Sequence, residues 1–415
     1  MSSPRFVVVG GGPAAGAAAR RFAEAGERVL VLTREPIGPY DRTVLSKTVL
    51  LDDAAEVPSV WPPGVPWREL IDVRPLTTVT ELHPDAGELV TQDGDTWPFE
   101  SLVLAPGAEP RRLVVTGADG PGIHHLRDCV DARGLAAALG GAGRLVVVGG
   151  GVIGLEVAAA AAQRGLAVTV VEAGTRVLGR GVPPPVADWL ADLHTRHGVS
   201  IRVGVSPQEV LRDGTGITGV HLSDGSVAEA DVVAVGIGIS PRTELAEAAG
   251  LVVADGIVVD TSMRTSHPAV LAAGDAVRLV TGPGDRGIRL ESFTAAGRQG
   301  EVAAAVAMGG ADTFEDVPWS WSDQYDATMQ VLGVPGPEAR EELVGDEGTP
   351  VVLSLDEAGR LVGVCGAGTG PGVARPVRAA AAAVARRVVP DLVAARAAGG
   401  DLRALTTVLH DAGRG

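Results

Sequence analysis

Two glycine-rich turns in the sequence have the residue types and the spacing that bind the pyrophosphate of a dinucleotide. The second turn, 149-GGGVIGLE-156, has glycine at all three positions of the pattern, as Gly149, Gly151 and Gly154. These positions allow a tight turn, a close approach of the backbone to phosphate, and close packing of the next helix on its strand. The amino terminus of that helix adds N–H groups and a partial positive charge, which favour an anion. This turn is therefore expected to bind a nucleotide.

An acidic residue follows each turn, at the end of the next apolar segment. After the second turn this residue is Glu172. In the first turn, 10-GGGPAAG-16, alanine replaces the third glycine, and Glu35 is the acid. The pattern tolerates that alanine because the position serves packing, and the acid accepts hydrogen bonds from ribose hydroxyls. Such turns also occur without a ligand, but two complete copies in a strand–turn–helix–strand context predict two dinucleotide-binding folds.

Two further residues are chemically distinctive. Lys47 is the only lysine among 415 residues, although the chain has 35 basic residues. Chance would explain a single lysine as well as a specific role would, although an ammonium is a compact point charge that arginine does not reproduce. Asp275 ends a predicted strand in 272-AAGDAV-277. If one of the two dinucleotides is a flavin, Asp275 is expected to accept hydrogen bonds from its ribityl hydroxyls. Its other expected role is to cap a helix, and the two roles are compatible.

Length and composition predict a globular protein of two or three domains. The chain of 415 residues is 46% hydrophobic and 21% charged. Its apolar runs are shorter than the ~20 residues that span a bilayer, and its amino terminus enters a predicted strand directly, so neither a membrane span nor a signal peptide is expected. The isolated Cys129 and Cys365 argue against a disulfide scaffold and against a metal or iron–sulfur site. A cytoplasmic location is the simplest expectation.

The net charge of −16 argues against nucleic acid as a partner. Nucleic-acid binding depends on basic groups that neutralise phosphates, and the sequence has no run of five or more basic residues.

The sequence resembles the FAD-dependent, NAD(P)H-using ferredoxin reductases of bacterial oxygenase systems, a branch of the pyridine nucleotide–disulfide reductase superfamily without a redox disulfide. The resemblance covers nearly the whole chain, and its stretches 36-PIGPYDRTVLSK-47 and 317-VPWSWSDQYD-326 are specific to this branch. The other matching stretches are 10-GGGPAAG-16, 102-LVLAPGAEPR-111, 149-GGGVIGLE-156, 232-VVAVGIGISPRTELAEAAGL-251, 272-AAGDAV-277 and 289-RLESFTAA-296.

The resemblance implies an α/β protein with two Rossmann-like dinucleotide-binding domains, one for FAD and one for NAD, and a C-terminal α+β domain. Residues 1–108 and 240–312 are expected to form a discontinuous FAD domain, with the NAD domain, 109–239, inserted into it. Residues 313–415 are expected to form the C-terminal domain.

The resemblance also implies roles for individual residues. Lys47 is expected beside the flavin, paired with Glu156 as the catalytic pair, where an ammonium stabilises charge on the reduced ring. The residues expected to contact FAD are Gly10, Gly12, Ala14, Ala15, Glu35, Arg42, Lys47, Val79, Arg127, Asp275, Phe293 and Trp321. Those expected to contact NAD are Gly149, Gly151, Ile153, Gly154, Glu156, Glu172, Gly236 and Glu291.

The activity implied is hydride transfer from NADH to FAD, followed by single-electron transfer to a small iron–sulfur ferredoxin that supplies an oxygenase. Three alternatives remain open from the sequence. An NADH oxidase or peroxidase normally has a cysteine near the LSK motif, and 43-TVLSKTVL-50 has none. A nitrite-reductase-type module usually has further iron–sulfur cysteines. A flavoprotein that acts only through protein interaction is the third alternative.

The C-terminal sequence carries a candidate docking surface. The pattern over 351–366 predicts two strands that are joined at 357–359. Residues 366–376 are expected to form a loop, and residues 376–389 are expected to form a helix. Arg375, Arg378 and Arg386 fall near one face of such a helix, with Arg387 beside them. This face is either an ordinary solvated surface or a basic patch for an acidic ferredoxin.

Overall fold

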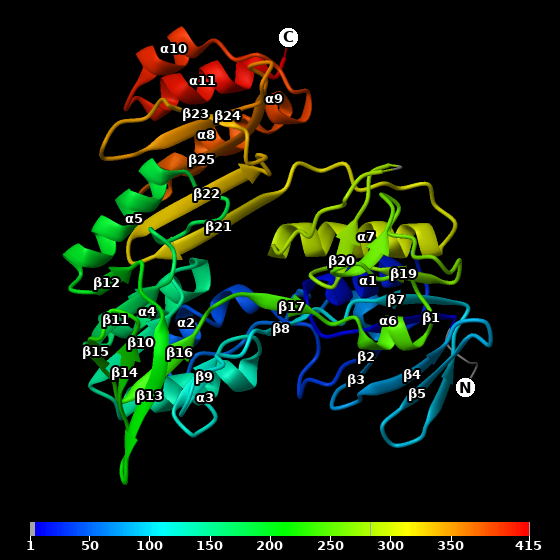
Figure 1. Cartoon of the computed structure of the whole chain (residues 1–415). Coiled ribbons are helices and arrows are strands. Elements are labelled where there is room, and N and C mark those ends of the chain that lie inside the picture. The colour runs from blue at the N-terminus through cyan, green and yellow to red at the C-terminus, as the bar shows by residue number, and fades with distance from the viewer. Residues whose placement is uncertain (1–4, 283, 415) are drawn as a thin grey trace. The chain divides into compact units, whose positions relative to one another are not determined.

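The computed structural model describes residues 5–282 and 284–414 (Figure 1). The chain divides into two compact units. The first consists of the described residues up to Thr43 together with Glu56–Glu109 and Ile239–Asp316. The second consists of Val44–Ala55, Pro110–Gly238 and the described residues from Val317 onward. Each unit is built around its own parallel sheet.

The sheet of the first unit has five parallel strands in the order β19-β7-β1-β2-β3. These strands are β1 (Phe6–Val9), β2 (Val29–Leu32), β3 (Ile71–Arg74), β7 (Ser101–Leu104) and β19 (Val270–Ala272). All residues of β1 and β2 are buried, which explains their unbroken apolar sequences. Helix α1 (Pro13–Glu24) connects β1 to the parallel strand β2 and completes a βαβ unit.

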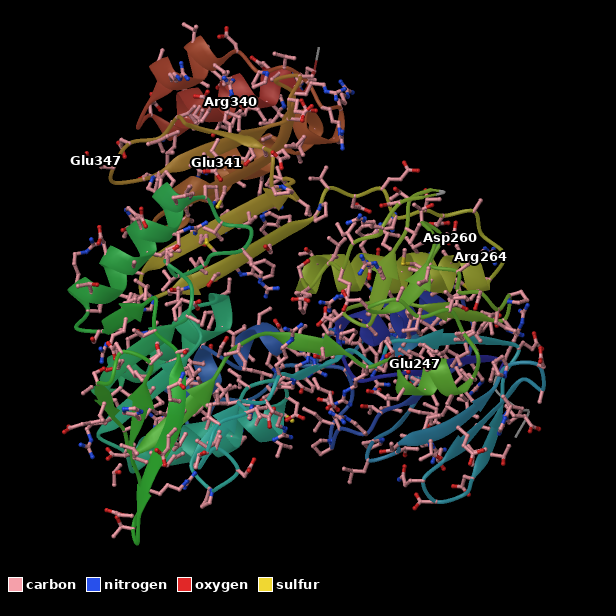
Figure 2. The ribbon with its side chains drawn as sticks, viewed as in Figure 1. Glu247, Asp260, Arg264, Arg340, Glu341 and Glu347 are labelled. Atoms are coloured by element: carbon pink, nitrogen blue, oxygen red, sulfur yellow. The ribbon has the colours of Figure 1, made fainter. Side chains whose placement is uncertain are left out.

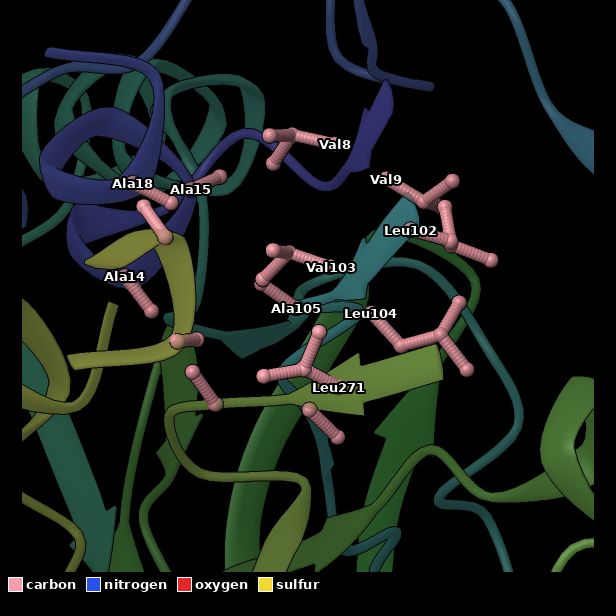
Figure 3. Packing of buried hydrophobic residues seen from close by; sticks show 14 of the residues in the cluster. Val8, Val9, Ala14, Ala15, Ala18, Leu102, Val103, Leu104, Ala105 and Leu271 are labelled. Carbon is pink, nitrogen blue, oxygen red and sulfur yellow. The ribbon is translucent and has the colours of Figure 1, made fainter. Parts of the chain in front are cut away.

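Helix α1 packs against the sheet and against α7 (Phe293–Ala307) through small residues. Ala14, Ala15 and Ala18 of α1 lie near apolar side chains of the sheet, including Val103 (Figure 3). A Cβ at Gly300 of α7 would lie 2.1 Å from the carbonyl oxygen of Ala14, so only glycine permits this helix contact. The alanine-rich sequence of α1 thus serves close helix packing.

The remaining elements of the first unit surround this sheet. A three-stranded antiparallel sheet consists of β4 (Val79–His83), β5 (Glu88–Thr91) and β6 (Thr96–Pro98). Two further strands, β18 (Ile257–Val259) and β20 (Val277–Leu279), form a pair. The short helices are η1 (Arg42–Val44), η2 (Pro66–Leu70) and α6 (Glu244–Ala248). Strand β8 (Ala108–Pro110) pairs with β17 (Ile239–Pro241). Charged side chains such as Glu247, Asp260 and Arg264 cover this unit (Figure 2).

The second unit repeats the βαβ pattern with five parallel strands in the order β12-β11-β10-β16-β9. These are β9 (Ile123–His125), β10 (Arg144–Val148), β11 (Ala167–Glu172), β12 (Ser200–Val203) and β16 (Val232–Val235). Its helices are α2 (Thr48–Leu51), α3 (Cys129–Gly140), α4 (Val152–Gln163) and α5 (Pro184–Arg196), and β13 (Pro207–Asp213), β14 (Gly216–Leu222) and β15 (Val227–Glu229) form a separate antiparallel sheet. Helix α4 is the crossover that follows the second glycine turn.

A five-stranded antiparallel sheet with helices completes the second unit. Its strands, in the order β21-β22-β25-β24-β23, are β21 (Trp319–Gln324), β22 (Ala327–Gly333), β23 (Arg340–Leu343), β24 (Val351–Leu355) and β25 (Leu361–Thr369). The helical elements are η3 (Pro371–Val373), α8 (Ala374–Ala379), α9 (Ala381–Ala385), α10 (Leu392–Ala398) and α11 (Leu402–Ala412). The charged Arg340 and Glu341 lie on β23, and Glu347 lies on the loop after it (Figure 2).

The predicted fold class is confirmed, and so are the two strands joined at 357–359. Two finer predictions are wrong. The helix expected over 376–389 is two short helices separated at Ala380, and the loop expected over 366–376 is partly occupied by β25 and α8. The three domain boundaries stay predictions; within the described residues, 110–238 and 317–414 belong to one compact unit.

No helix in residues 5–282 and 284–414 is long and apolar enough to cross a membrane.

Candidate cofactor and catalytic site

The first glycine turn is shaped by backbone contacts that exclude side chains. Gly10 has φ of +142°, and a Cβ there would lie 2.1 Å from the carbonyl oxygen of Ala105. Gly12 is different: it caps α1 in an extended conformation, and its nearest neighbours are atoms of the Arg42 guanidinium, from 3.5 Å. The turn therefore leaves open space beside Gly12, bounded by a helix amino terminus and a fixed cation.

Glu35 lies just beyond the end of β2, next to the same turn. Its buried carboxylate accepts hydrogen bonds from the Tyr40 hydroxyl and the Arg42 guanidinium. A carboxylate offers about four acceptor positions, and these bonds use two of them. Gly12, Arg42 and Glu35 thus lie together, and the contact of the predicted residues with FAD stays a prediction.

An unpaired buried donor lies beside the loop that contains Asp275. Gln299 of α7 is fully buried and accepts a hydrogen bond from the backbone N–H of Gly274 at 2.8 Å. Its Nε2 atom has no hydrogen-bond partner among the described residues. Buried polar atoms are nearly always paired, so a free amide beside Gly274 and Asp275 fits a polar ligand at this edge of the sheet. The first unit therefore has the residues to hold FAD.

The second glycine turn is also shaped by close backbone contacts. A Cβ at Gly149, whose φ is +108°, would lie 2.4 Å from the carbonyl oxygen of Gly236, and one at Gly154 would lie 2.1 Å from the carbonyl oxygen of Gly149. Gly151 is the exception, because the nearest atom to its Cβ position is 4.0 Å away. Gly149, Gly154 and Gly236 build the turn, while Gly151 leaves room for a phosphate at the amino terminus of α4.

Glu172 ends β11 and holds the loop around this turn. Its carboxylate accepts hydrogen bonds from the N–H groups of Gly150, at 2.8 Å, and Gly174, at 2.7 Å. Arg176 donates to the carbonyl oxygens of Val177 and Leu178, so its guanidinium serves the loop. The carboxylate is fixed where the pattern places the adenosine ribose of NAD.

We predict that NADH is preferred over NADPH because of Glu172. A 2′-phosphate would meet this fixed carboxylate, and repulsion of about 1.4 kcal/mol would lower kcat/KM about tenfold. Steady-state kinetics with both coenzymes measures the preference. Glu172→Ser should narrow it, and Asp213→Asn, at the exposed end of β13 in the same unit, is the control. An equal or higher kcat/KM with NADPH would contradict the assignment.

A small pocket lies beside Gly154 and Gly236, and the sequence did not predict its polar lining. His124 and His125 of β9 border it. Burial lowers the pKa of both imidazoles, and Arg112 lowers the pKa of His125 further. Both side chains are therefore neutral at neutral pH. Ile153, also predicted to contact NAD, borders the pocket and is one of the exposed apolar residues.

Lys47 and Glu156 form the predicted ion pair. The Lys47 ammonium lies 2.9 Å from Oε1 of Glu156, whose side chain is only 3% exposed. The segment around Lys47 is held on the second unit by burial of Leu50 and by Arg164, which donates to the carbonyl oxygen of Leu50 at 2.7 Å. This anchoring places a fixed positive charge at the amino end of α2.

Two serines that the sequence did not predict complete the coordination of Glu156. The Ser46 hydroxyl donates to one carboxylate oxygen, and the Ser322 hydroxyl donates to the other at 2.7 Å. Both hydroxyls are buried. The LSK and WSDQ motifs contain these serines, so the signal was present, but nothing in the sequence indicated that they meet at one carboxylate. With Lys47 they satisfy the buried charge.

Trp321 lies on β21, on the face opposite to Ser322. It stacks on Trp319 with ring centroids 4.9 Å apart, and the Trp319 indole N–H donates to Gln330 at 2.9 Å. The guanidinium of Arg378 lies 5.1 Å above the Trp319 ring. A rigid aromatic pair next to an arginine is thus present on this sheet.

The other predicted site residues lie in separate places within their units. Val79 begins β4, Phe293 begins α7, and the nearby Glu291 pairs with Arg289 at 3.0 Å, all in the first unit. Arg127 precedes α3 in the second unit, and its N–H donates to Asp131 at 2.9 Å. Their contacts with cofactors stay predictions.

Comparison with known proteins agrees with this geometry. The model of the pyridine nucleotide-disulphide oxidoreductase family matches residues 4–309. The chain belongs to this family. A second model, the reductase C-terminal domain, matches residues 319–406. Both five-stranded parallel sheets lie within the first match, and the five-stranded antiparallel sheet of β21 to β25 lies within the second.

Several curated relatives are reductases of named electron carriers. The chain is 38% identical over 94% of its length to the ferredoxin–NAD(+) reductase component of an anthranilate 1,2-dioxygenase system from Burkholderia cepacia, covering 96% of that protein. It is 36% identical to rhodocoxin reductase of Rhodococcus erythropolis, over 79% of this chain and 78% of that one. Among solved structures, the covalent putidaredoxin reductase–putidaredoxin complex matches with a TM-score of 0.86 and 30% identity, covering 96% of this chain and 99% of that chain.

Proposed function

We propose that this protein is an NADH-dependent, FAD-containing ferredoxin reductase that supplies electrons to an oxygenase through a small iron–sulfur protein. The observation that carries the proposal is the fixed Lys47–Glu156 pair in a chain with two dinucleotide turns. FAD, when bound, accepts a hydride from NADH and releases its electrons one at a time. The residues of this chain bind both dinucleotides and hold a positive charge in place.

The cysteines support electron exit without a protein disulfide. Neither Cys129 nor Cys365 forms a disulfide; both are buried, and they lie on different elements, α3 and β25. Burial raises the pKa of the Cys365 thiol far above its usual range, so this thiol is not a thiolate at neutral pH. No cysteine lies near Lys47 in the sequence. The chain therefore lacks the reactive cysteine that a disulfide reductase or a cysteine-dependent peroxidase requires.

The proposal is tested by steady-state turnover of the FAD-loaded protein with NADH. Rapid reduction of ferricyanide and of a [2Fe–2S] ferredoxin, with slow oxygen consumption, is the expected result. Oxygen consumption that equals NADH oxidation when ferredoxin is present would identify an oxidase instead. Failure of every acceptor to support turnover would favour a role in protein interaction.

The arginines near the C-terminal sheet are the candidate docking surface for an acidic ferredoxin. Arg375, Arg378, Arg386 and Arg387 are all exposed. They do not share one helix face as predicted, because α8 ends at Ala379 and Arg386 binds the carbonyl oxygen of Gly413 at 2.7 Å. Arg378, next to the Trp319–Trp321 pair, is the best placed of them.

We predict that the double variant Arg375→Glu/Arg378→Glu slows ferredoxin reduction about tenfold at low salt. Charge reversal weakens electrostatic steering, which acts within about 8 Å at physiological salt. The salt dependence of the ferredoxin rate should decrease, and ferricyanide reduction should stay near the wild-type rate. Arg340→Glu, an exposed arginine on β23, is the matched control. Equal loss with both acceptors, or no loss with either, would place docking elsewhere.

A cytoplasmic location belongs to the same proposal. It is supported by Cys129 and Cys365, which form no disulfide and so fit a reducing compartment.

A further inference from the structure

A buried imidazole on α5 is linked to the Lys47–Glu156 pair through side chains of β21. His194 is fully buried, and its Nε2 atom lies 2.7 Å from Oε1 of Gln324. The Gln324 amide donates to the Ser322 hydroxyl at 2.9 Å, and that hydroxyl donates to Glu156 at 2.7 Å. The imidazole thus reaches the carboxylate through two intermediate side chains.

The donor and the acceptor of each hydrogen bond between His194 and Glu156 follow from the Glu156 carboxylate. Ionised Glu156 only accepts, so the Ser322 hydroxyl must donate to it and therefore accepts from Gln324. Gln324 then presents its NH2 group to Ser322 and its oxygen to His194. Because that oxygen only accepts, Nε2 of His194 carries the proton.

The other imidazole nitrogen is consistent with the same direction. Nδ1 of His194 lies 3.2 Å from the hydroxyl of Tyr325, which donates to it. The groups that face His194 are Gln324, Tyr325 and His197, and the ring of His197 stacks on that of Tyr325 at 3.7 Å. Burial lowers the pKa of His194 and His197 lowers it further, while the bond to Gln324 opposes the change. A neutral His194 in the Nε2–H form satisfies all of these contacts.

We propose that His194 is a positioning residue that acts through Gln324 and Ser322 to hold the Glu156 carboxylate, and with it the Lys47 ammonium, in one orientation. An apolar residue would fill the same core without hydrogen bonds, so packing alone does not explain an imidazole here. If His194 is lost, Gln324 can turn its amide and Ser322 can leave the carboxylate. Glu156 would then keep fewer fixed donors, and Lys47 would be held less firmly.

The first test does not depend on activity. Nitrogen-15 NMR of the protein with labelled histidine should show the His194 ring as a neutral Nε2–H tautomer at pH 7, as its contacts with Gln324 and Tyr325 require. His194→Gln assigns that signal by its disappearance. In Ser322→Ala the signal should shift, since Gln324 loses its acceptor. A His194 that is charged at pH 7, or is an Nδ1–H tautomer, would overturn the proposal.

The second test rests on the proposed function and uses stopped-flow reduction of bound FAD by NADH. His194→Leu should slow reduction about threefold to tenfold and lower the flavin midpoint potential, because a less fixed ammonium stabilises the reduced flavin less. His194→Gln, which keeps a donor and an acceptor, should restore most of the rate. Leu190→Ala, a buried residue one turn earlier on α5, should lower the melting temperature and leave the rate unchanged.

A double-mutant cycle separates positioning from general destabilisation. His194→Leu and Ser322→Ala break the same chain, so their effects on the reduction rate should be far less than additive. Additive effects, or a rate loss in Leu190→Ala equal to that in His194→Leu, would overturn the proposal. Failure of the proposed function would appear differently, as loss of NADH turnover in the wild type with the NMR result unchanged.

Discussion

Replacing Lys47 with methionine is expected to slow flavin reduction by NADH at least tenfold, with FAD still bound. Methionine keeps the length of the side chain and removes its charge. The ammonium lies 2.9 Å from a carboxylate whose side chain is 3% exposed, so its removal leaves that carboxylate with the two serine hydroxyls. Loss of one partner of a buried pair costs about 3–5 kcal/mol, and the serines reduce this value. Stopped-flow absorbance at the flavin band measures the rate, and an unchanged rate would exclude a catalytic role for Lys47.

Two companion variants separate charge at the flavin from the stability of the fold. Lys47→Met combined with Glu156→Gln removes both charges and should recover thermal stability, but it should not recover the rate. Lys47→Arg keeps the charge on a larger, planar group and should remain slow, although the chain uses arginine at every other basic position. Recovery of the full rate by arginine would mean that the site requires only a positive charge.

The parts of the site that the sequence predicted are those set by local geometry. Gly10 and Gly149 have positive φ values and face a backbone carbonyl at close range, so the residue type itself reports the conformation. Glu35 and Glu172 follow from their position at or just beyond the carboxyl end of a strand in a βαβ unit. Within each unit the glycine and the acid belong to one βαβ segment, 25 residues apart for Gly10 and Glu35 and 23 for Gly149 and Glu172, so a local pattern is sufficient to identify them.

The parts that the sequence did not predict depend on contacts between distant segments. Ser322 meets Glu156 only because β21 packs beside α4, and His194 joins them only because α5 packs on the same sheet. A serine or a glutamine in a strand has no pattern that indicates its partner. The family resemblance supplied the Lys47–Glu156 pair, but not the side chains that orient it.

The broken C-terminal helix shows how packing overrides local preference. The alanine-rich sequence after Pro376 favours one long helix. Ala380, Ala383 and Val384 are instead buried in the core of the C-terminal sheet, and the turn between α8 and α9 lets both helices reach it. Arg387 then adopts a left-handed conformation, with φ of +51°, beyond the end of α9. Arg375 and Arg378 consequently lie on α8, whereas Arg386 and Arg387 follow the end of α9.

Substitution by alanine is expected to affect the melting temperature differently at two glycines of the second turn, Gly149 and Gly151. Gly149→Ala places a Cβ 2.4 Å from the carbonyl oxygen of Gly236 at a positive φ, so the variant should lose several degrees of melting temperature even without a ligand. Gly151→Ala has φ of −77° and nothing closer than 4.0 Å, so its melting temperature should match that of the wild type. Thermal unfolding of the two proteins without NADH measures this difference.

NADH binding should separate the same two variants in a second way. In Gly151→Ala the new methyl group occupies the space left for phosphate at the start of α4, so the KM for NADH should rise at least tenfold while FAD content stays normal. Gly12→Ala should instead lower the FAD content and leave the KM for NADH normal, because the new Cβ would enter the space beside Arg42. A normal KM in Gly151→Ala, with the fold intact, would show that the coenzyme pyrophosphate does not approach this backbone. The second glycine turn would then have a role in packing only, and no role in binding the coenzyme.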